Sequence, residues 1–305
     1  MSQQYSTELG GRTLTIETGK FAAQANGSVT VRYGDTVVLG TAVMSANVRE
    51  GMDYFPLLVD YEERLYAAGK IKGSRFIKRD GRPSDEATLT ARLIDRAVRP
   101  LFNQAARNDV QVVLTVLSVD QENDADIVAL VAASAALSVS NIPWSGPVGA
   151  VRVGRINGEW VLNPTYEARE KSELDLVLAG TKDEHIMIEA SGSEVEEETV
   201  LGALEFAQKW VKQVIELVEE VVKKEGQEKA EFGSLKMSDE EKAAREKIAA
   251  KVKAFTDGKL RDILVAKDKA ARKEKRIVLD AELDEMLKKD NEGHEGAARV
   301  RSARP

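Results

Sequence analysis

Residues 110–140, VQVVLTVLSVDQENDADIVALVAASAALSVS, hold the clearest structural signal in this chain. Residues 110–119 are mostly valine, leucine and threonine, a pattern typical of a strand buried in a sheet. Residues 126–140 are dominated by alanine and serine. Alanine favours helix, and small side chains allow a helix to pack closely on a sheet. The stretch therefore predicts a buried strand followed by a central helix.

Strand signals lie on both sides of this stretch. Residues 28–33 and 36–43 alternate between apolar and polar side chains around Gly34-Asp35, which predicts a β-hairpin. On the C-terminal side, Asn157-Gly158 accepts the positive φ angles of a tight hairpin turn. The further strands predicted there are residues 148–153, 160–162, 174–179 and 185–189.

A long amphipathic helix is predicted after these strands. Residues 194–224 carry apolar side chains at helical spacing, and Gly226 ends the pattern. Strands followed by helices indicate the α+β class. The apolar stripe consists of Val200, Leu204, Ala207, Val211, Ile215, Val218 and Val222.

The composition changes after Gly226, where Lys, Glu and Ala become dominant. Ser238 and Glu241 fit a capping box that would begin a new set of helices, running to about residue 289. With 305 residues and 43% hydrophobic content, the chain can bury one large core or two modest ones. The expected organisation is a two-lobed core with lobes at 1–145 and 146–226, a linker at 227–237, an all-α domain at 238–292 and a disordered tail at 293–305.

Several protein classes are excluded by composition. The chain has no cysteine, so disulfide frameworks, thiolate zinc sites and cysteine nucleophiles are ruled out. Residues 1–4 do not begin a signal peptide, and no run of 18 apolar residues occurs, so we expect neither secretion nor a membrane span. The cytoplasm is the expected location.

The charge distribution is uneven. The formal net charge is -7, which argues against a uniformly basic nucleic-acid-binding protein. Residues 72–107 nevertheless contain nine basic and four acidic side chains. A local basic patch therefore lies within an acidic protein.

The segment GSRFIKRDGRPS, residues 73–84, is the densest part of this patch. Its glycines and proline forbid a continuous helix, so Lys78, Arg79 and Arg82 are predicted to form a cluster of cations on a loop. Such a cluster suits the phosphates of an RNA backbone, and Phe76 offers a ring for base stacking. We favour this binding role for the loop because few carboxylates are close in sequence.

The next segment, residues 88–101, is predicted to be a helix with one basic face. At 100° per residue, Arg92, Arg96 and Arg99 fall within about 60° of one another, and apolar side chains take the other side. These arginines are candidates for RNA phosphates. The alternative is a structural network in which they pair with carboxylates such as Asp95 or Glu86.

Other candidate residues carry weaker signals. His185 lies in a strand pattern and His294 in the tail, so they form neither a ligand cluster nor a triad. Asp124 and Asp126 are possible Mg²⁺ ligands, but an aspartate at a helix start more often caps the helix. We therefore predict neither catalytic nor metal-binding residues in this chain.

Three motifs carry a resemblance to a known family: FPLLVDYEERLYAAGKIKGS (55–74), GRPSDEATLTARLIDRAVRPLF (81–102) and NDADIVALVAASAALSVSNIPWSGPVGAVRVG (123–154). Together they closely resemble the first core of bacterial polynucleotide phosphorylases, and the resemblance covers residues 5–206. It implies a ribonuclease PH-like core followed by an all-α domain. It also implies a homotrimer that degrades single-stranded RNA, including mRNA, from the 3′ end with inorganic phosphate and Mg²⁺, with other RNA-degradation components as possible partners.

The resemblance also predicts which residues bind RNA. The family's basic loop reads Phe-Phe-Arg-Arg, whereas this chain has Phe76-Ile77-Lys78-Arg79. Charge is kept, but a bidentate donor and a ring are lost. The RNA-binding role is therefore carried over to Lys78, Arg79 and Arg82.

The family's catalytic positions are not kept in this core. Where active cores bind the attacking phosphate, this chain has Ala125-Asp126-Ile127, and an aspartate repels the dianion. The family's Mg²⁺-binding Asp, Asp and Lys align with Arg169, Asp175 and Val177. We therefore expect a non-catalytic, RNA-guiding core, with catalysis and Mg²⁺ in a second core that the sequence does not reach before Pro305. A stand-alone RNA-binding or assembly module is the alternative.

Overall fold

The computed structural model describes residues 2–48, 52, 54–71, 73, 82–232 and 239–290. Its contacts divide the chain into two compact units, Met1–Gly233 and Ser234–Pro305. Each unit is described by itself.

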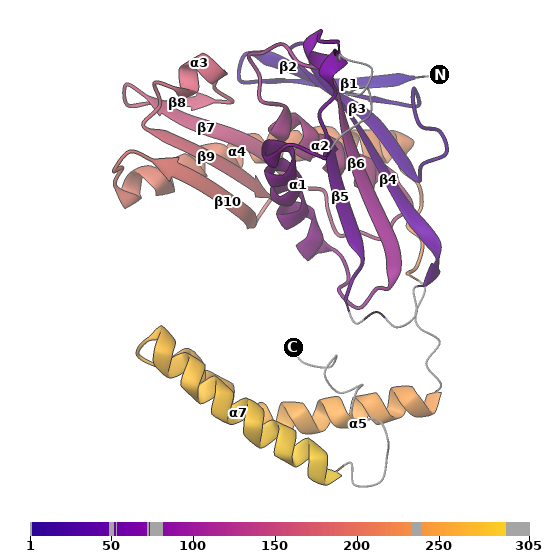
Figure 1. The fold of residues 1–305 in the computed structure, drawn as a ribbon, viewed down its shortest axis with the longest axis vertical. Helices are drawn as coiled ribbons and strands as arrows, with labels where there is room; N and C mark the ends of the chain where they lie inside the picture. Colours follow the sequence, from indigo (N-terminus) through magenta and orange to yellow (C-terminus); the bar gives the residue numbers. More distant parts are fainter. Residues whose placement is uncertain are drawn as a thin grey trace. The chain divides into compact units, whose positions relative to one another are not determined.

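The first unit contains a six-stranded sheet in the order β1-β2-β3-β4-β6-β5 (Figure 1). All neighbouring strands are antiparallel except β5 and β6, which are parallel. The predicted hairpin is confirmed as β3 and β4, and the predicted buried strand as β6. The strands are β1 (Gln3–Leu9), β2 (Arg12–Thr18), β3 (Gly27–Tyr33), β4 (Thr36–Val48), β5 (Leu57–Glu62) and β6 (Asn108–Ser118).

A second, four-stranded antiparallel sheet has the order β10-β9-β7-β8. The predicted hairpin around Asn157-Gly158 is confirmed, and both turn residues have positive φ, 51° and 82°. The strands are β7 (Gly149–Ile156), β8 (Glu159–Leu162), β9 (Leu174–Gly180) and β10 (His185–Gly192).

Helix α2 (Ala125–Val139) lies at the centre of this unit, as the sequence predicts, and it contacts both β4 and β7 (Figure 1). Its small side chains let the strands approach closely. A Cβ atom on Gly27 would lie 2.1 Å from the carbonyl oxygen of Ala136, and one on Gly40 would lie 2.8 Å from that of Ala132. Because fourteen of its residues are buried, α2 joins the two sheets into one core.

The first unit contains two further long helices. The predicted basic helix is α1 (Asp85–Val98), followed by the short helix η3 (Arg99–Leu101). It begins three residues earlier than the expected 88, because the Ser84 side chain caps it by accepting a bond from the Ala87 N–H, 3.0 Å. Helix α4 (Glu197–Glu225) is the long amphipathic helix and packs on α2, β1, β7 and β9.

The segment expected to be a linker is partly docked on the core. The backbone N–H groups of Gln227 and Ala230 donate to the carbonyls of Val139 and Asn141, 3.0 and 2.7 Å. The last carbonyls of a helix lack intrahelical donors, and the Lys229 ammonium group supplies donors to three carbonyls around the end of α2. Its Nζ lies 2.7 to 3.0 Å from the oxygens of Leu137, Ser138 and Ser140.

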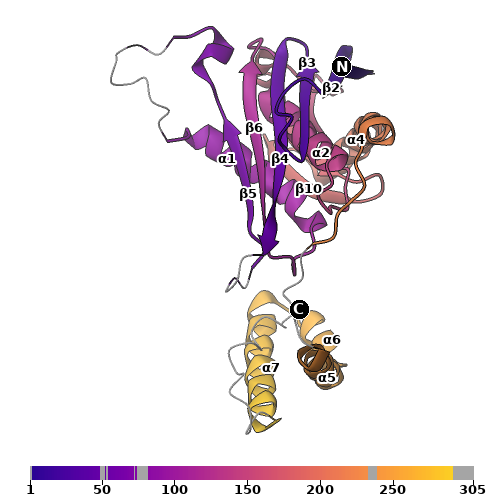
Figure 2. The ribbon, with the colours of Figure 1, turned by 90° about the vertical axis from the view of Figure 1, so that its right-hand side faces the viewer.

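The second unit is helical, with α5 (Asp239–Thr256), α6 (Lys259–Leu264) and α7 (Lys269–Asp290) (Figure 2). Leu279, Leu283 and Leu287, four residues apart on α7, are buried. The predicted run of helices to about residue 289 is thus confirmed over the described residues, whereas Ser238 and residues 293–305 lie outside them. Among the helices described, none is both long and apolar enough to cross a membrane.

Candidate functional site

The basic face of α1 is present, and its three arginines differ in their contacts. The Arg92 side chain is exposed and has no ion pair with any residue that the structure describes. Arg96 pairs with Glu189 on β10, with 2.7 Å between Nη2 and Oε2, and both side chains are more than half exposed. An ion pair this exposed contributes little to stability and can be exchanged for another anion.

Arg99 is held more firmly than the other two. Its Nε and Nη2 atoms donate to both carboxylate oxygens of Asp95, at 2.8 and 2.6 Å, and Nη2 also donates to the Leu57 carbonyl, 3.1 Å. For this residue the contacts match the structural network that the sequence left open. Arg96 and Arg99 also line an open groove whose other wall is formed by Ile186, Met187 and Ile188.

The predicted basic loop is only partly described. Arg82 is exposed and lies two residues before the α1 cap, Ser84. Phe76, Lys78 and Arg79 lie outside the described residues, so their RNA-binding role stays a prediction.

A second group of charges lies at the N-terminus of α2. Arg152, on β7, is 8% exposed, and its Nη2 lies 2.6 Å from Asp126 Oδ2 and 3.2 Å from Asp124 Oδ2. Its Nη1 donates to both carboxylate oxygens of Asp175 on β9, 2.7 and 2.9 Å. Arg169, on α3 (Tyr166–Arg169), also binds Asp124 and Asp175. We call these five residues the ion-pair cluster.

Burial and neighbouring charges shift the protonation of the cluster. Burial raises the pKa of Asp126, Asp124 raises it further, and Arg152 opposes both. Burial by itself would lower the pKa of Arg152, but Asp126, Asp124 and Asp175 outweigh it, and the pKa is raised. Burial, together with the charges of Glu63, Asp126 and Asp124, also raises the pKa of Tyr61. Burial and the Asp124 charge therefore favour the protonated form of Asp126 and raise its pKa above the ordinary value for an aspartate.

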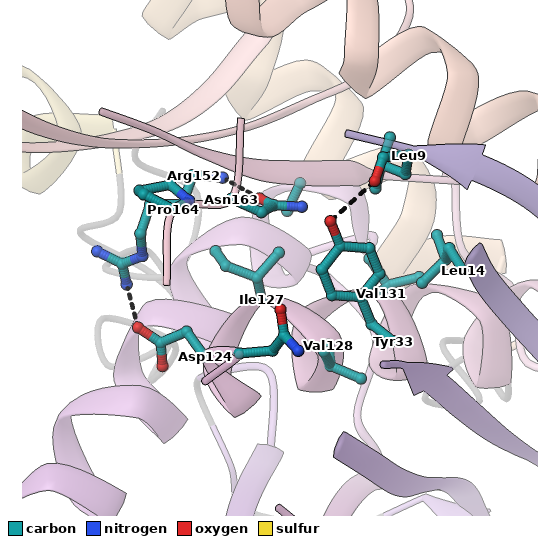
Figure 3. A pocket seen from close by; sticks show the side chains of 12 residues that line it. Leu9, Leu14, Tyr33, Asp124, Ile127, Val128, Val131, Arg152, Asn163 and Pro164 are labelled. Atoms are coloured by element: carbon teal, nitrogen blue, oxygen red, sulfur yellow. Dashed lines mark hydrogen bonds and ion pairs between the residues drawn. The ribbon is translucent and has the colours of Figure 1, made fainter. Parts of the chain in front are cut away.

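A small cavity of about 20 Å³ adjoins the cluster (Figure 3). Arg152 and Asp124 lie at one side of it, and the Tyr33 ring and Leu9 at the other, where the Tyr33 hydroxyl donates to the Leu9 carbonyl, 2.8 Å. This volume suffices for a water molecule and is far too small for a nucleotide.

The cluster does not fit the binding of a phosphate or of Mg²⁺. A helix N-terminus attracts anions, but here Asp124 and Asp126 already place negative charge there. A metal ion would need the same carboxylates that the two guanidinium groups bind. Among the described residues, no group of three or more His, Cys, Asp or Glu side chains is arranged to hold a metal ion.

The expected capping role of the two aspartates needs correction. Asp124 occupies the N-cap position of α2, but its side chain makes no capping hydrogen bond. It binds Arg152 and Arg169, because a guanidinium group is a stronger partner for a carboxylate than a neutral N–H group. Asp126 accepts a bond from the N–H of the next residue, Ile127, 2.5 Å, and its other oxygen binds Arg152.

Sequence reasoning missed Arg152 entirely. The available signal was a charged residue between Val151 and Val153 in a strand that is otherwise apolar. A charge on a buried strand requires a buried partner. Arg169 and Asp175 were identified only as positions aligned with the family's catalytic residues.

The comparisons with known proteins agree with this fold. Residues 10–143 match the model of the 3′ exoribonuclease family, domain 1, and residues 146–209 match domain 2 of the same family. The chain therefore belongs to the 3′ exoribonuclease family, the ribonuclease PH family. The rice Rrp46 structure shares the fold, with a TM-score of 0.54 at 16% identity, over 71% of this chain and 95% of that one.

Several relatives are named polyribonucleotide nucleotidyltransferase. The one from Heliobacterium modesticaldum is 51% identical over 88% of this chain and 37% of its own length. The one from Bacillus cytotoxicus is 53% identical over 80% of this chain and 34% of its own length. The chain thus spans less than half the length of these relatives, and the resemblance to bacterial polynucleotide phosphorylases is confirmed.

Proposed function

We propose that this chain is the RNA-binding N-terminal portion of a phosphate-dependent 3′-to-5′ exoribonuclease. The reaction converts a polyribonucleotide and inorganic phosphate into a shorter RNA and a nucleoside diphosphate. The family membership and the names of the relatives support this activity for the whole enzyme. The expected place of the activity is the cytoplasm, in the degradation of RNA and mRNA.

In this proposal the core of the chain guides RNA and does not cleave it. The observation that carries this part is the ion-pair cluster, in which Arg152 and Arg169 neutralise the carboxylates at the N-terminus of α2. An attacking phosphate would have to displace a buried guanidinium group and approach two aspartates. Mg²⁺ and the attacking phosphate therefore belong to a second core of the enzyme.

RNA is held by the basic loop and the basic face of α1. Arg92 and Arg96 are four residues apart, about 6 Å along the helix axis, which is on the scale of neighbouring phosphates in a single strand. Among the residues proposed to bind RNA in the loop, the structure describes Arg82, and Phe76, Lys78 and Arg79 complete the proposed set. Arg99 contributes less than the others, because Asp95 already binds its guanidinium group.

The remaining parts of the proposal concern assembly. The enzyme acts as a homotrimer, as the family resemblance implies, and RNA-degradation components are candidate partners. An alternative is that the chain acts as a stand-alone RNA-binding or assembly module. The ion-pair cluster favours this alternative for the isolated chain. Its paired charges leave no site for phosphate or Mg²⁺, whereas the basic face of α1 remains available for RNA.

The test is a phosphorolysis assay with the purified chain, Mg²⁺, inorganic phosphate and polyadenylate, compared with a phosphate-free control. We expect RNA binding by fluorescence anisotropy but no release of ADP. Phosphate-dependent ADP release would overturn the assignment of this core as non-catalytic. Absence of RNA binding would overturn the RNA-guiding role.

A further inference from the structure

Apolar side chains are exposed next to the basic segment. Leu65 and Tyr66 lie on the short helix η1 (Leu65–Ala68), just after β5, and are 45% and 59% exposed. Ile71 follows shortly after and is 95% exposed. One exposed leucine is ordinary on a protein surface, but an exposed aromatic ring with two aliphatic neighbours in seven residues needs a reason. We call Leu65, Tyr66 and Ile71 the η1 patch.

The backbone that carries the η1 patch is held in place. The carbonyl of Ala67 accepts a bond from the N–H of Val119, 3.1 Å, which ties η1 to the end of β6. Gly69, with a φ of 67°, closes the short helix, and its N–H donates to the Tyr66 carbonyl, 3.0 Å. Because this backbone is fixed before any ligand arrives, covering the Tyr66 ring costs little conformational entropy.

Basic residues lie within and after the patch along the chain, and the structure describes two of them, Lys70 and Arg82. The Ser84 hydroxyl donates to Glu63, with 2.7 Å between Oγ and Oε2, and this bond brings the start of α1 to the end of β5. Arg82 lies two residues before Ser84, and η1 begins two residues after Glu63, so the bond brings Arg82 toward η1. Residues 70–86 contain six basic and three acidic side chains, so this part of the chain carries a positive charge.

We propose that the η1 patch binds an unpaired base of single-stranded RNA, with the Tyr66 ring as its stacking surface. This inference rests on the RNA binding proposed above and adds a residue outside the predicted RNA-binding set. An aromatic ring beside cations suits a ligand that has both a π-face and an anionic backbone. A protein partner that buried only the apolar side chains would make no contact with the neighbouring basic residues, whereas RNA would contact both.

The experiment compares three variants in binding to oligoadenylate, measured by fluorescence anisotropy at several salt concentrations. Tyr66→Leu removes the ring and should weaken binding roughly 5- to 150-fold, the range expected for one stacked base. Its salt slope should stay that of the unmodified chain, because no phosphate contact is lost. Tyr66→Phe keeps the ring and should bind like the unmodified chain.

Tyr54→Leu is the matched control. Tyr54 is 61% exposed, similar to Tyr66, but it precedes β5, whereas Tyr66 follows it. The six residues of β5 span about 20 Å, so the two rings lie toward opposite ends of this strand. Tyr54→Leu should leave RNA binding unchanged.

The outcomes separate this inference from the proposed function. If the unmodified chain binds RNA and Tyr66→Leu binds equally well, the η1 patch is not a base-binding surface, while the proposed function stands. If the unmodified chain does not bind RNA, both fail. If Tyr66→Leu instead dissociates a self-assembled form in analytical ultracentrifugation without affecting RNA binding, the patch is a contact between copies of the chain.

Discussion

Arg152 on β7 donates to Asp126 at the start of α2, with 2.6 Å between Nη2 and Oδ2. This bond connects the four-stranded sheet to the helix that packs between both sheets, and Arg169 extends it to α3. The cluster therefore has a structural effect: it holds together two parts of the chain that match separate family domains. The family resemblance predicts that active cores bind phosphate at this position, so we expect the same residues to account both for stability and for a lack of catalysis.

Replacing Arg152 should strongly destabilise the first unit. Arg152→Met keeps the volume but leaves three carboxylates with one guanidinium group, and breaking a buried ion pair in this way costs about 3–5 kcal/mol. The free energy of unfolding, measured by urea denaturation, should fall by this amount. Arg96→Met is the matched control, because it breaks an exposed pair and should cost at most about 1 kcal/mol. Equal losses in the two variants would contradict the structural role of the cluster.

Asp126 should make the unfolding free energy depend on pH. Its pKa is raised in the folded chain by burial, so above its ordinary value of about 4 the folded state binds more protons than the unfolded state. Its contribution to stability is fully present below that value and is lost as the pH rises through the raised pKa. Asp126→Asn should remove this part of the slope. A pH series of urea denaturation checks it, and identical slopes for both proteins would refute it.

Asp120 should show the opposite dependence. It accepts bonds from the N–H groups of Asn123, Glu122 and Asp35, at 2.7, 2.9 and 3.1 Å. Burial alone would raise its pKa, but these bonds, led by those from Asn123, lower it to about 2. Its contribution is present above the ordinary value of about 4 and is lost as the pH falls through 2.

Asp120→Ala should therefore lower stability at neutral pH by about 1–3 kcal/mol, the cost of leaving donors unpaired. The difference from the unmodified chain should shrink in acid, as thermal unfolding between pH 2 and pH 7 would show. Asp35→Ala is the control, because its side chain is 75% exposed and pairs only with Arg32 among the described residues. If Asp120→Ala lowered the free energy of unfolding by the same amount at every pH, the ionised carboxylate of Asp120 would not be the form that binds these N–H groups.

Removing the charges of the basic loop should weaken the binding of single-stranded RNA to a similar extent for all RNA sequences. In Lys78→Ala, Arg79→Ala and Arg82→Ala combined, each lost phosphate contact should lower the salt slope of binding by roughly 0.7. The control replaces three lysines on α4, Lys209, Lys212 and Lys223, with Ala, and so lowers the net charge by the same three units. Anisotropy titrations with single-stranded RNA would compare the two, and a similar weakening in both would mean that only net charge matters.

Local patterns in the sequence were sufficient for most of the secondary structure. The hairpin around Asn157-Gly158 and the small-residue helix α2 both depend on residues close together in the chain, and both are confirmed. The docking of residues 227–232 was not predicted. Lys229 binds carbonyls about ninety residues earlier in the chain, and a local sequence pattern carries no information about such a distant contact.

The same division applies to the functional residues. The sequence by itself determined the family and the basic segment, and it predicted that Asp126 and Val177 replace the usual catalytic residues, because these inferences depend on residue identity at matched positions. Only the tertiary structure decided that Arg152 neutralises Asp126 and that Arg99 is held by Asp95 while Arg92 is exposed. An ion pair needs two charges within a few ångströms of each other, and it is folding that brings residues 126, 152 and 175 to that distance.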